Sequence, residues 1–456
     1  MKYCNNILEL IGNTPLVKLN RITKGIIAPV FVKLETRNPG SSIKDRIGIA
    51  MIERAEREGR LTAGGLIIEA TSGNTGIGIA LAAAVKGYRC LFVTTDKASS
   101  ERIRYLKALG ADVIITTSKV GPNSPEYYVN IAIELSRTIP NSVLFNQYDN
   151  PANTDAHYTS TGPEIWEQTE GRVSHFIAGM GTGGTITGIA RYLKEQNSAI
   201  RVIAADPVGS IIKTYKETGT LAEGTPYLIE GVGQDRIPAN LDLSLIDDIE
   251  LVTDCEAFEM ARRLARQEGI FCGGSSGMNV VVALRVARTV PADSCVVTII
   301  CDTGERYLSK HHSEEWLRSQ NIELEDVFTA GLILERKRGR ALIPSLVSVT
   351  ENTSVAEALE LMEHYDLDRL PVLRSHIVIG TLIKDTLLEK VIQSPDILSS
   401  TIPEYMSPPL ATIDAHAGFE QLREQLSTEP ALIVTVYGYP SGIVTREDVI
   451  EYINRA

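Results

Sequence analysis

Lys44 is the residue whose surroundings most directly predict chemistry. It lies in residues 38–46, Asn-Pro-Gly-Ser-Ser-Ile-Lys-Asp-Arg, where a polar turn gives way to an apolar pattern of helical period. A lysine amine becomes a useful Schiff-base nucleophile when burial or a nearby positive group lowers its pKa, and a turn inside a cleft can supply both. A solvated surface charge is the commoner role of a lysine taken alone, so the rest of the chain has to decide.

A polar segment at residues 71–76, Thr-Ser-Gly-Asn-Thr-Gly, follows the apolar run 66–70 and precedes the apolar stretch 77–85. This order predicts a strand, a tight turn and a helix. Glycines let a ligand approach the backbone closely, and hydroxyl and amide donors at a helix N-terminus favour anions. The turn could therefore hold a substrate carboxylate, although an ordinary helix N-cap explains the same pattern.

Two more glycine-rich segments open helices. Residues 179–185, Gly-Met-Gly-Thr-Gly-Gly-Thr, lie between the apolar run 176–178 and a helical pattern over residues 186–193, which predicts a phosphate cradle. The segment lies far from the first βαβ unit and lacks the Gly-Lys-Ser/Thr ending of a nucleotide P-loop, so it is not a dinucleotide fingerprint. Residues 272–277, Cys-Gly-Gly-Ser-Ser-Gly, are explained by a capped turn when taken alone.

Short apolar runs alternate with helical patterns through the first 300 residues. The strand-like runs are residues 66–70, 89–94, 112–116, 174–179, 200–205 and 295–300. The helical patterns are residues 43–58, 74–86, 99–109, 186–195 and 254–268. This alternation predicts a parallel α/β sheet covered on both faces, in which ligands bind at the carboxyl ends of the strands.

Lys44 and the three glycine-containing segments together resemble the fold type II pyridoxal phosphate enzymes, and among them the cystathionine β-synthases. Further matches lie at residues 11–16, 146–148, 230–233 and 302–307, so the resemblance covers roughly residues 7–315. It implies a tryptophan synthase β-like catalytic domain over residues 1–318, built of two α/β lobes with pyridoxal 5′-phosphate between them.

The resemblance assigns a role to each motif residue. Lys44 would hold the cofactor covalently and serve as general base for the substrate α-proton. The other expected cofactor-binding residues are Asn74, Gly181, Thr182, Gly183, Gly184, Thr185 and Ser275. The expected substrate-binding residues are Thr71, Ser72, Thr75, Gln147, Tyr148 and Gly231. Ser275 would face the pyridine nitrogen, and a hydroxyl there leaves that nitrogen largely unprotonated, which favours β-elimination over transamination.

The implied activity is that of a transsulfuration lyase of cysteine biosynthesis. Homocysteine replaces the hydroxyl of serine to give L-cystathionine and water, and hydrogen sulfide is released when cysteine is the substrate. Cysteine synthases, which use O-acetylserine and sulfide, share the lysine and both loops and are the first alternative. The segment 230–235, the segment 302–307 and the C-terminal repeat favour cystathionine synthesis, whereas Gln234 and Arg236 replace aromatic residues on the thiol side.

The chain changes character after about residue 318. Residues 319–341 lack the α/β rhythm and are expected to be a linker. Residues 342–456 contain a weak repeat with an offset of about 62 residues, and this α+β pattern resembles a tandem pair of CBS domains, which often bind adenosyl ligands. S-adenosylmethionine is therefore a candidate regulatory ligand, its ribose held by Thr445 and Asp448, whereas the first repeat has Ile383 and Thr386 at those positions.

Two other interpretations of this C-terminal part stay open. The repeat could be a degenerate module that only packs against the catalytic half. Alternatively, the whole chain could be an adenosyl-ligand sensor with a decayed catalytic half, which the intact Lys44, Asn74 and Ser275 oppose. The family resemblance also implies a homodimer, and the repeat could build a homotetramer.

Composition restricts the partners and the compartment. The chain has 456 residues, a net charge of −12, 43% hydrophobic and 22% charged residues, which is ordinary for a globular enzyme and argues against nucleic acid as a partner. No run of 18 apolar residues and no basic-then-apolar leader is present, so neither membrane insertion nor export is expected. The six scattered cysteines predict reduced thiols in the cytoplasm, and the seven histidines show no metal-binding spacing. No haem is expected, since the family pattern begins at about Ile7 and Cys4 is a poor ligand.

Overall fold

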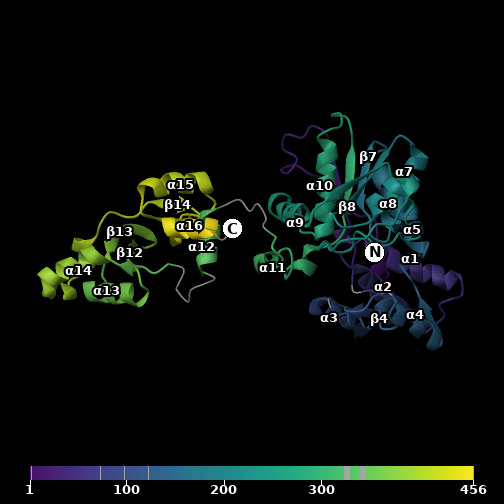
Figure 1. Cartoon of the computed structure of the whole chain (residues 1–456), viewed down its shortest axis with the longest axis horizontal. Helices are drawn as coiled ribbons and strands as arrows, with labels where there is room; N and C mark the ends of the chain where they lie inside the picture. Colours follow the sequence, from purple (N-terminus) through teal and green to yellow (C-terminus); the bar gives the residue numbers. More distant parts are fainter. Residues whose placement is uncertain are drawn as a thin grey trace. The chain divides into compact units, whose positions relative to one another are not determined.

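The protein is described by a computed structural model that covers residues 1, 3–71, 73–96, 98–121, 123–322, 329–338 and 346–454. The chain divides into two compact units, residues 1–324 and residues 325–456, which are described separately (Figure 1). Among the described residues, every helix is too short or too polar to cross a bilayer.

The larger lobe of the first unit is built on a six-stranded sheet with the order β1-β2-β10-β7-β8-β9. Its strands are β1 (Leu16–Lys18), β2 (Val30–Leu34), β7 (His175–Gly179), β8 (Arg201–Pro207), β9 (Asp248–Val252) and β10 (Val296–Ile300). Neighbouring strands are parallel except β1, which runs antiparallel to β2.

Both faces of this sheet are buried, because side chains alternate along each strand and both sets are apolar. Ile177 of β7 packs in the core formed with α9 (Asp254–Arg263) and α10 (Gly274–Ala287). Its neighbours Phe176 and Ala178 pack in the opposite core, formed with α7 (Gly184–Gln196). The helices α10 and α7 therefore lie on opposite faces of one sheet.

The smaller lobe is built on a four-stranded parallel sheet with the order β5-β4-β3-β6. Its strands are β3 (Leu66–Ala70), β4 (Arg89–Thr95), β5 (Asp112–Thr116) and β6 (Ser142–Leu144), and its helices are α1 (Lys44–Arg57), α2 (Asn74–Lys86), α3 (Ser100–Ala108) and α4 (Tyr128–Thr138). In Figure 1, α2, α3 and α4 group with β4, whereas α7, α8 (Ile212–Thr218) and α10 group with β7 and β8. The two-lobed α/β fold is confirmed, although the strand rhythm alone predicted a single sheet.

Two glycines set the crossing of α1 and α2. A Cβ on Gly48 would lie 2.4 Å from the carbonyl carbon of Gly78, and a Cβ on Gly78 would lie 2.5 Å from the carbonyl oxygen of Lys44. The helices pack this closely only because neither position has a side chain. Their first turns, which carry Lys44 and Asn74, consequently lie side by side.

The second unit contains two similar halves. The first half comprises β11 (Val349–Thr350), α13 (Val355–His364), β12 (Arg369–Arg374), β13 (Ile377–Ile383) and α14 (Lys384–Gln393); the second comprises β14 (Thr412–Asp414), α15 (Phe419–Thr428), β15 (Ala431–Val436), β16 (Tyr439–Thr445) and α16 (Arg446–Asn454). In each half the first two strands are parallel and the last two are antiparallel.

The expected linker, residues 319–341, contains the helix α12 (Ala330–Arg338). Its side chains Ala330, Ile333 and Leu334 are buried in one core with Ile413 and Leu422 of the second half. This part of the expected linker therefore belongs to the fold of the second unit.

Candidate active site

A cavity of about 740 Å³ lies in the first unit, at the carboxyl ends of β3, β4, β7 and β10. Of the expected site residues, Lys44, Thr71, Asn74, Thr75, Gln147, Tyr148, Gly181, Thr182, Gly183, Thr185, Gly231 and Ser275 line it. Gly184 is not part of the lining, and Ser72 lies outside the described residues. Residues far apart in the sequence are thus brought around one cavity.

Lys44 is the first residue of α1, and its side chain faces this cavity half-buried. Burial lowers the pKa of its amine, and the nearby Cys301 and Asp302 oppose that shift less strongly. A larger share of the amine is therefore neutral near pH 7 than in an exposed lysine. A neutral amine can act as a nucleophile or a base.

The segment from Gly181 to Thr185 forms a cradle at the N-terminus of the 13-residue helix α7. A Cβ on Gly181 would lie 2.3 Å from the carbonyl oxygen of Gly231, and Gly183 adopts the left-handed region with φ +86°. Any other residue would fill the cradle or strain the turn. Free backbone N–H groups and the helix dipole favour a phosphate here, so the loop fits the pyridoxal phosphate that the sequence predicts.

Neighbouring side chains orient the threonines of this loop. Asn153 donates to Oγ1 of Thr182 at 2.9 Å, and Nε2 of His157 lies 3.2 Å from Oγ1 of Thr185. Burial, reinforced by the charges of Lys44 and Arg46, lowers the pKa of His157 well below its usual value. The neutral ring can donate to Thr185, which leaves the threonine hydroxyl hydrogen for an anion.

His157 begins a π-helix, His157–Thr161, between α5 (Ala152–Ala156) and α6 (Gly162–Gln168). Nδ1 of its ring lies 2.9 Å from Oγ1 of Thr161, four residues along the chain. Single π-helical turns occur frequently at functional sites. Nothing in the sequence pattern marked His157, because the turn reads as ordinary helix.

Asn74 lies at the first turn of α2 with its amide held on both sides. Its Nδ2 donates to Oδ2 of Asp302 at 2.7 Å, and Arg306 donates to its Oδ1. The hydroxyl of Tyr307 also donates to Oδ2 of Asp302, at 2.7 Å. These contacts fix which way the amide faces and leave one Nδ2 hydrogen free for a ligand oxygen. The sequence marked residues 302–307 as a family match without assigning them this role.

The expected carboxylate-binding residues lie on the small-lobe side. Thr75 donates from Oγ1 to Oε1 of Gln147 at 2.6 Å, and both side chains are buried. The backbone carbonyl of Gln147 accepts hydrogen bonds from Asn153 at 2.8 Å and Asn240 at 2.9 Å. The Gln147 side chain also hydrogen-bonds Glu69, whose pKa burial raises to about 7.

Ser275 is the second residue of α10 and is buried beside Cys301 in the cavity wall. Burial raises the pKa of the Cys301 thiol to about 11, so both groups are neutral at physiological pH. A wall of this kind offers a cofactor ring nitrogen no negative charge. That environment agrees with the weak electron sink expected from Ser275.

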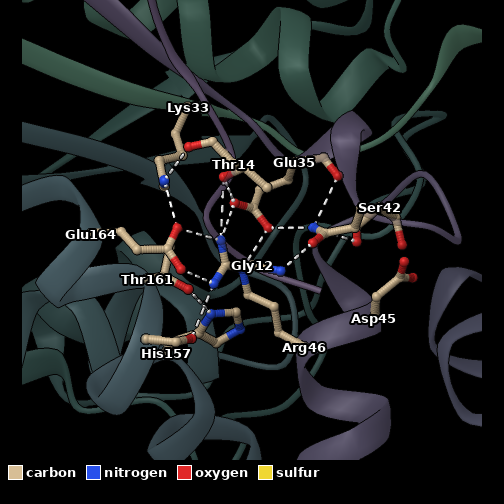
Figure 2. A network of polar contacts seen from close by, with 12 residues as sticks. Gly12, Thr14, Lys33, Glu35, Ser42, Asp45, Arg46, His157, Thr161 and Glu164 are labelled. Carbon is tan, nitrogen blue, oxygen red and sulfur yellow. Dashed lines mark hydrogen bonds and ion pairs between the residues drawn. The ribbon is translucent and has the colours of Figure 1, made fainter. Parts of the chain in front are cut away.

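A buried ionic network is made of Lys33, Glu35, Arg46 and Glu164 (Figure 2), and its Arg46 follows Lys44 by two residues in α1. Arg46 of α1 pairs with Glu35 and with Glu164, both at 2.7 Å, and Lys33 pairs with Glu164 at 2.6 Å. Each buried charge has an opposite partner, as charges in a low dielectric require. The network ties the first turn of α1 to β2 and α6, and sequence reasoning missed it.

In the second unit, Thr445 and Asp448 are in direct contact. Thr445 donates to Oδ2 of Asp448 from its backbone at 2.8 Å and from its hydroxyl at 3.0 Å. Lys337 of α12 donates to the same oxygen at 2.8 Å. The two residues expected to bind ribose are therefore in contact with each other. The Asp448 carboxylate also accepts a hydrogen bond from Lys337 of the same unit.

Comparisons with known proteins identify the family. The family "Pyridoxal-phosphate dependent enzyme" matches residues 7–302, and the CBS domain matches residues 340–392 and 402–455. Cystathionine β-synthase of Dictyostelium discoideum is 36% identical across 99% of this chain and 93% of that protein. The enzyme of Apis mellifera is 46% identical across 70% of this chain and 64% of that protein, which is less than two thirds of its length.

A solved structure gives the same result. The O-acetylserine-dependent cystathionine β-synthase of Helicobacter pylori is 39% identical, with a TM-score of 0.62, over 68% of this chain and 99% of that one. The chain therefore belongs to the pyridoxal-phosphate-dependent enzyme family and, within it, to the cystathionine β-synthases that carry a C-terminal pair of CBS domains.

Proposed function

We propose that this pyridoxal-phosphate-dependent lyase joins serine and homocysteine to give L-cystathionine and water. The observation that carries the proposal is one cavity in which a lysine of lowered pKa lies with a glycine cradle, an uncharged wall at Ser275 and the Thr75–Gln147 pair. When bound, pyridoxal phosphate supplies an electron sink for the electron pair released at the substrate Cα. We assign its phosphate to residues 181–185, its ring to Asn74 and Ser275, and its covalent attachment to Lys44.

Lys44 moves the proton in this proposal. The neutral amine accepts the α-proton and passes it to the β-hydroxyl, which leaves with its electron pair as water; the thiol then gives its proton to the same amine as its sulfur bonds to Cβ. The Lys44 ammonium returns a proton to Cα. Thr71, Thr75 and Gln147 hold the substrate carboxylate during both halves. Tyr148 and Gly231 line the same cavity, and Ser72 stays a substrate-binding residue expected from the sequence alone.

The same residues serve other leaving groups. With cysteine as the first substrate the leaving group is hydrosulfide, so hydrogen sulfide is the second product. The Helicobacter pylori relative is described as O-acetylserine dependent, which makes acetate a further candidate leaving group and cysteine synthesis from sulfide the competing function.

The experiment that tests the proposal is a product assay by mass spectrometry on the cofactor-loaded protein given serine and homocysteine. Cystathionine from the wild type, lost in Lys44→Ala and kept in the exposed control Lys24→Ala, is the expected result. Cystathionine formation that survives in Lys44→Ala would remove Lys44 from the reaction.

For the second unit we propose an adenosyl-ligand site, with S-adenosylmethionine as the ligand and Thr445 and Asp448 on its ribose. We further propose a homodimer or homotetramer in the cytoplasm. The six cysteines, all free in the structure, support a reducing compartment. Light scattering of the purified protein measures the oligomeric state directly.

A further inference from the structure

Arg46 is a buried side chain of the first unit that has no part in the proposed chemistry. It is the third residue of α1, and its side chain is 2% exposed. Lys44, the first residue of α1, lines the cavity, whereas Arg46 is not part of the lining. Residues two positions apart on a helix point to different sides, so Arg46 holds the start of α1 from outside the cavity.

Arg46 binds two carboxylates, each through two hydrogen bonds. It donates to both oxygens of Glu35 at 2.7 and 2.8 Å, and to both oxygens of Glu164 at 2.7 and 2.8 Å. Glu35 follows the last residue of β2, and Glu164 lies in α6, whose Ile165 packs in the large-lobe core. The start of α1 is therefore tied to the large lobe by paired bonds that a lysine could not make.

A third contact of Arg46 reaches the π-helix beside the phosphate cradle. Its Nη1 donates to Oγ of Ser160 at 3.1 Å. Ser160 lies in the same π-helix as His157, whose ring contacts Oγ1 of Thr185 at 3.2 Å. This turn packs closely on α7, since a Cβ on Gly188 would lie 2.9 Å from Cβ of His157. A shift of the π-helix would therefore disturb the cradle at the start of α7.

Residues 11–16, a family match in the sequence, complete the network. The hydroxyl of Thr14 donates to Glu35 at 2.7 Å, and the backbone N–H of Asn13 donates to Glu164 at 3.0 Å. Both carboxylates that pair with the guanidinium are thus fixed in turn (Figure 2). A buried ionic network adds little stability over apolar residues of the same size, so the positions that it fixes explain its presence better.

We propose that Arg46 is a positioning residue that sets the distance between Lys44 and the phosphate cradle. The cofactor is held at both places, at the amine of Lys44 and through its phosphate at residues 181–185, so its two ends must match one fixed separation. A rigid protein presents the second attachment point at high effective concentration, and a loosened protein loses that gain while each contact by itself survives. The inference rests on the proposed roles of Lys44 and of the cradle.

The test compares the whole cofactor with its two parts, using the full-length protein freed of cofactor. In Arg46→Lys, the Kd for pyridoxal phosphate, followed by visible absorbance, should rise about 10-fold to 100-fold, the range for lost charged hydrogen bonds. The Kd for inorganic phosphate, followed by phosphorus NMR, and the Kd for pyridoxal should remain those of the wild type. Arg54→Lys is the matched control, since Arg54 also lies in α1 and pairs with two carboxylates but is 29% exposed.

Two results would overturn the inference. Equal losses for pyridoxal phosphate and for inorganic phosphate would mean that Arg46 only supports the cradle. An unchanged Kd for pyridoxal phosphate in Arg46→Lys would mean that the network sets no distance between the two attachment points.

Ser160→Ala keeps the test available if Arg46→Lys does not fold. It removes one hydrogen bond between Arg46 and the π-helix, so the Kd for pyridoxal phosphate should rise about 3-fold to 10-fold while the Kd for phosphate stays constant. Thr159→Ala is its control, because both hydroxyls donate to a carbonyl four residues earlier and that of Ser160 also accepts from Arg46. A constant Kd for pyridoxal phosphate in Ser160→Ala would likewise overturn the inference.

Failure of the proposed function is recognised separately. Borohydride reduction of the cofactor-loaded wild type, followed by mass spectrometry of its peptides, shows which lysine holds the cofactor. Attachment away from Lys44 would refute the assignment of Lys44 and the inference together. Attachment at Lys44 with equal losses for the cofactor and for phosphate would refute the inference alone.

Discussion

Asn74 and Asp302 are joined by a hydrogen bond of 2.7 Å from Nδ2 to Oδ2, although 228 residues separate them in the sequence. The bond connects the first turn of α2 in the small lobe to the loop after β10 in the large lobe. Because Arg306 donates to the other end of the same amide, the orientation of Asn74 is set from the large lobe.

Asp302→Ala should weaken cofactor binding. The change frees the Asn74 amide to rotate, and losing a hydrogen bond to a charged group corresponds to roughly a 10-fold to 100-fold loss of affinity. Titration of the purified protein with pyridoxal phosphate, followed by its visible absorbance, measures this. Asp302→Asn keeps an acceptor oxygen and should recover part of the loss; equal affinities in all three proteins would show that Asp302 does not position Asn74.

Gly48→Ala should destabilise the fold. Its Cβ would lie 2.4 Å from the backbone of Gly78, and overpacking of this kind costs about 1–3 kcal/mol. Urea unfolding of the cofactor-loaded protein reports the change. Gly121→Ala, whose Cβ would meet no atom within 4 Å, is the control and should unfold like the wild type. Identical midpoints for Gly48→Ala and the control would disprove the close crossing of α1 and α2.

The partly buried Glu164 carboxylate is expected to make the folded protein less stable in acid. Burial favours its neutral form, but Arg46 and Lys33 outweigh burial and lower its pKa to about 2. A carboxyl whose pKa is lower in the folded chain stabilises the fold above the unfolded pKa of about 4.5 and loses that contribution as pH falls toward 2. Glu164→Gln should therefore unfold with a smaller change in midpoint between pH 5 and pH 3 than the wild type.

The control for this pH effect is Glu170→Gln, because Glu170 is exposed and pairs only on the surface with Arg172. Its midpoints should follow those of the wild type at both pH values. A wild-type slope in Glu164→Gln would mean that other carboxyls govern acid unfolding.

In the second unit, Lys337 and S-adenosylmethionine are expected to compete for the Asp448 carboxylate. Lys337 donates to the carboxylate expected to bind ribose, so Lys337→Met should tighten S-adenosylmethionine binding, by up to about fivefold for a partly exposed ion pair. Asp448→Ala should abolish binding in calorimetry, while Thr386→Ala, at the equivalent position of the first half, should not alter it. Unchanged heat in Asp448→Ala would place any ligand elsewhere.

Local pattern was enough to predict much of the first unit. The strands at residues 66–70 and 112–116 and the helix at 74–86 have the bounds that the sequence indicated. Strands β1 and β6 have three residues each, too few for a periodic signal, and β2 carries the buried charge of Lys33 in an otherwise apolar run. A charged residue inside a strand is stable only with partners that local sequence does not show.

The functional site, like the fold, was only partly predictable from the sequence. Lys44 and the glycine-rich loops were predictable because each one is a short contiguous motif with its own backbone requirement. Arg102 and Lys310, which line the cavity, and His157, which contacts Thr185, were not predictable, since contacts with residues far away in the chain bring them there. An arginine on an amphipathic helix reads as a solvated surface residue until the fold places it in a cavity wall.

The most direct test of the account is a competition in one tube. The cofactor-loaded protein receives serine with equal concentrations of homocysteine and sulfide, and mass spectrometry follows cystathionine and cysteine over time. Cystathionine formed much faster than cysteine is the predicted result, because the charged side chains Arg102, Glu230 and Lys310 line the cavity and suit a nucleophile that carries an amino-acid end. Cysteine as the dominant product would contradict the account and assign the chain the activity of a cysteine synthase.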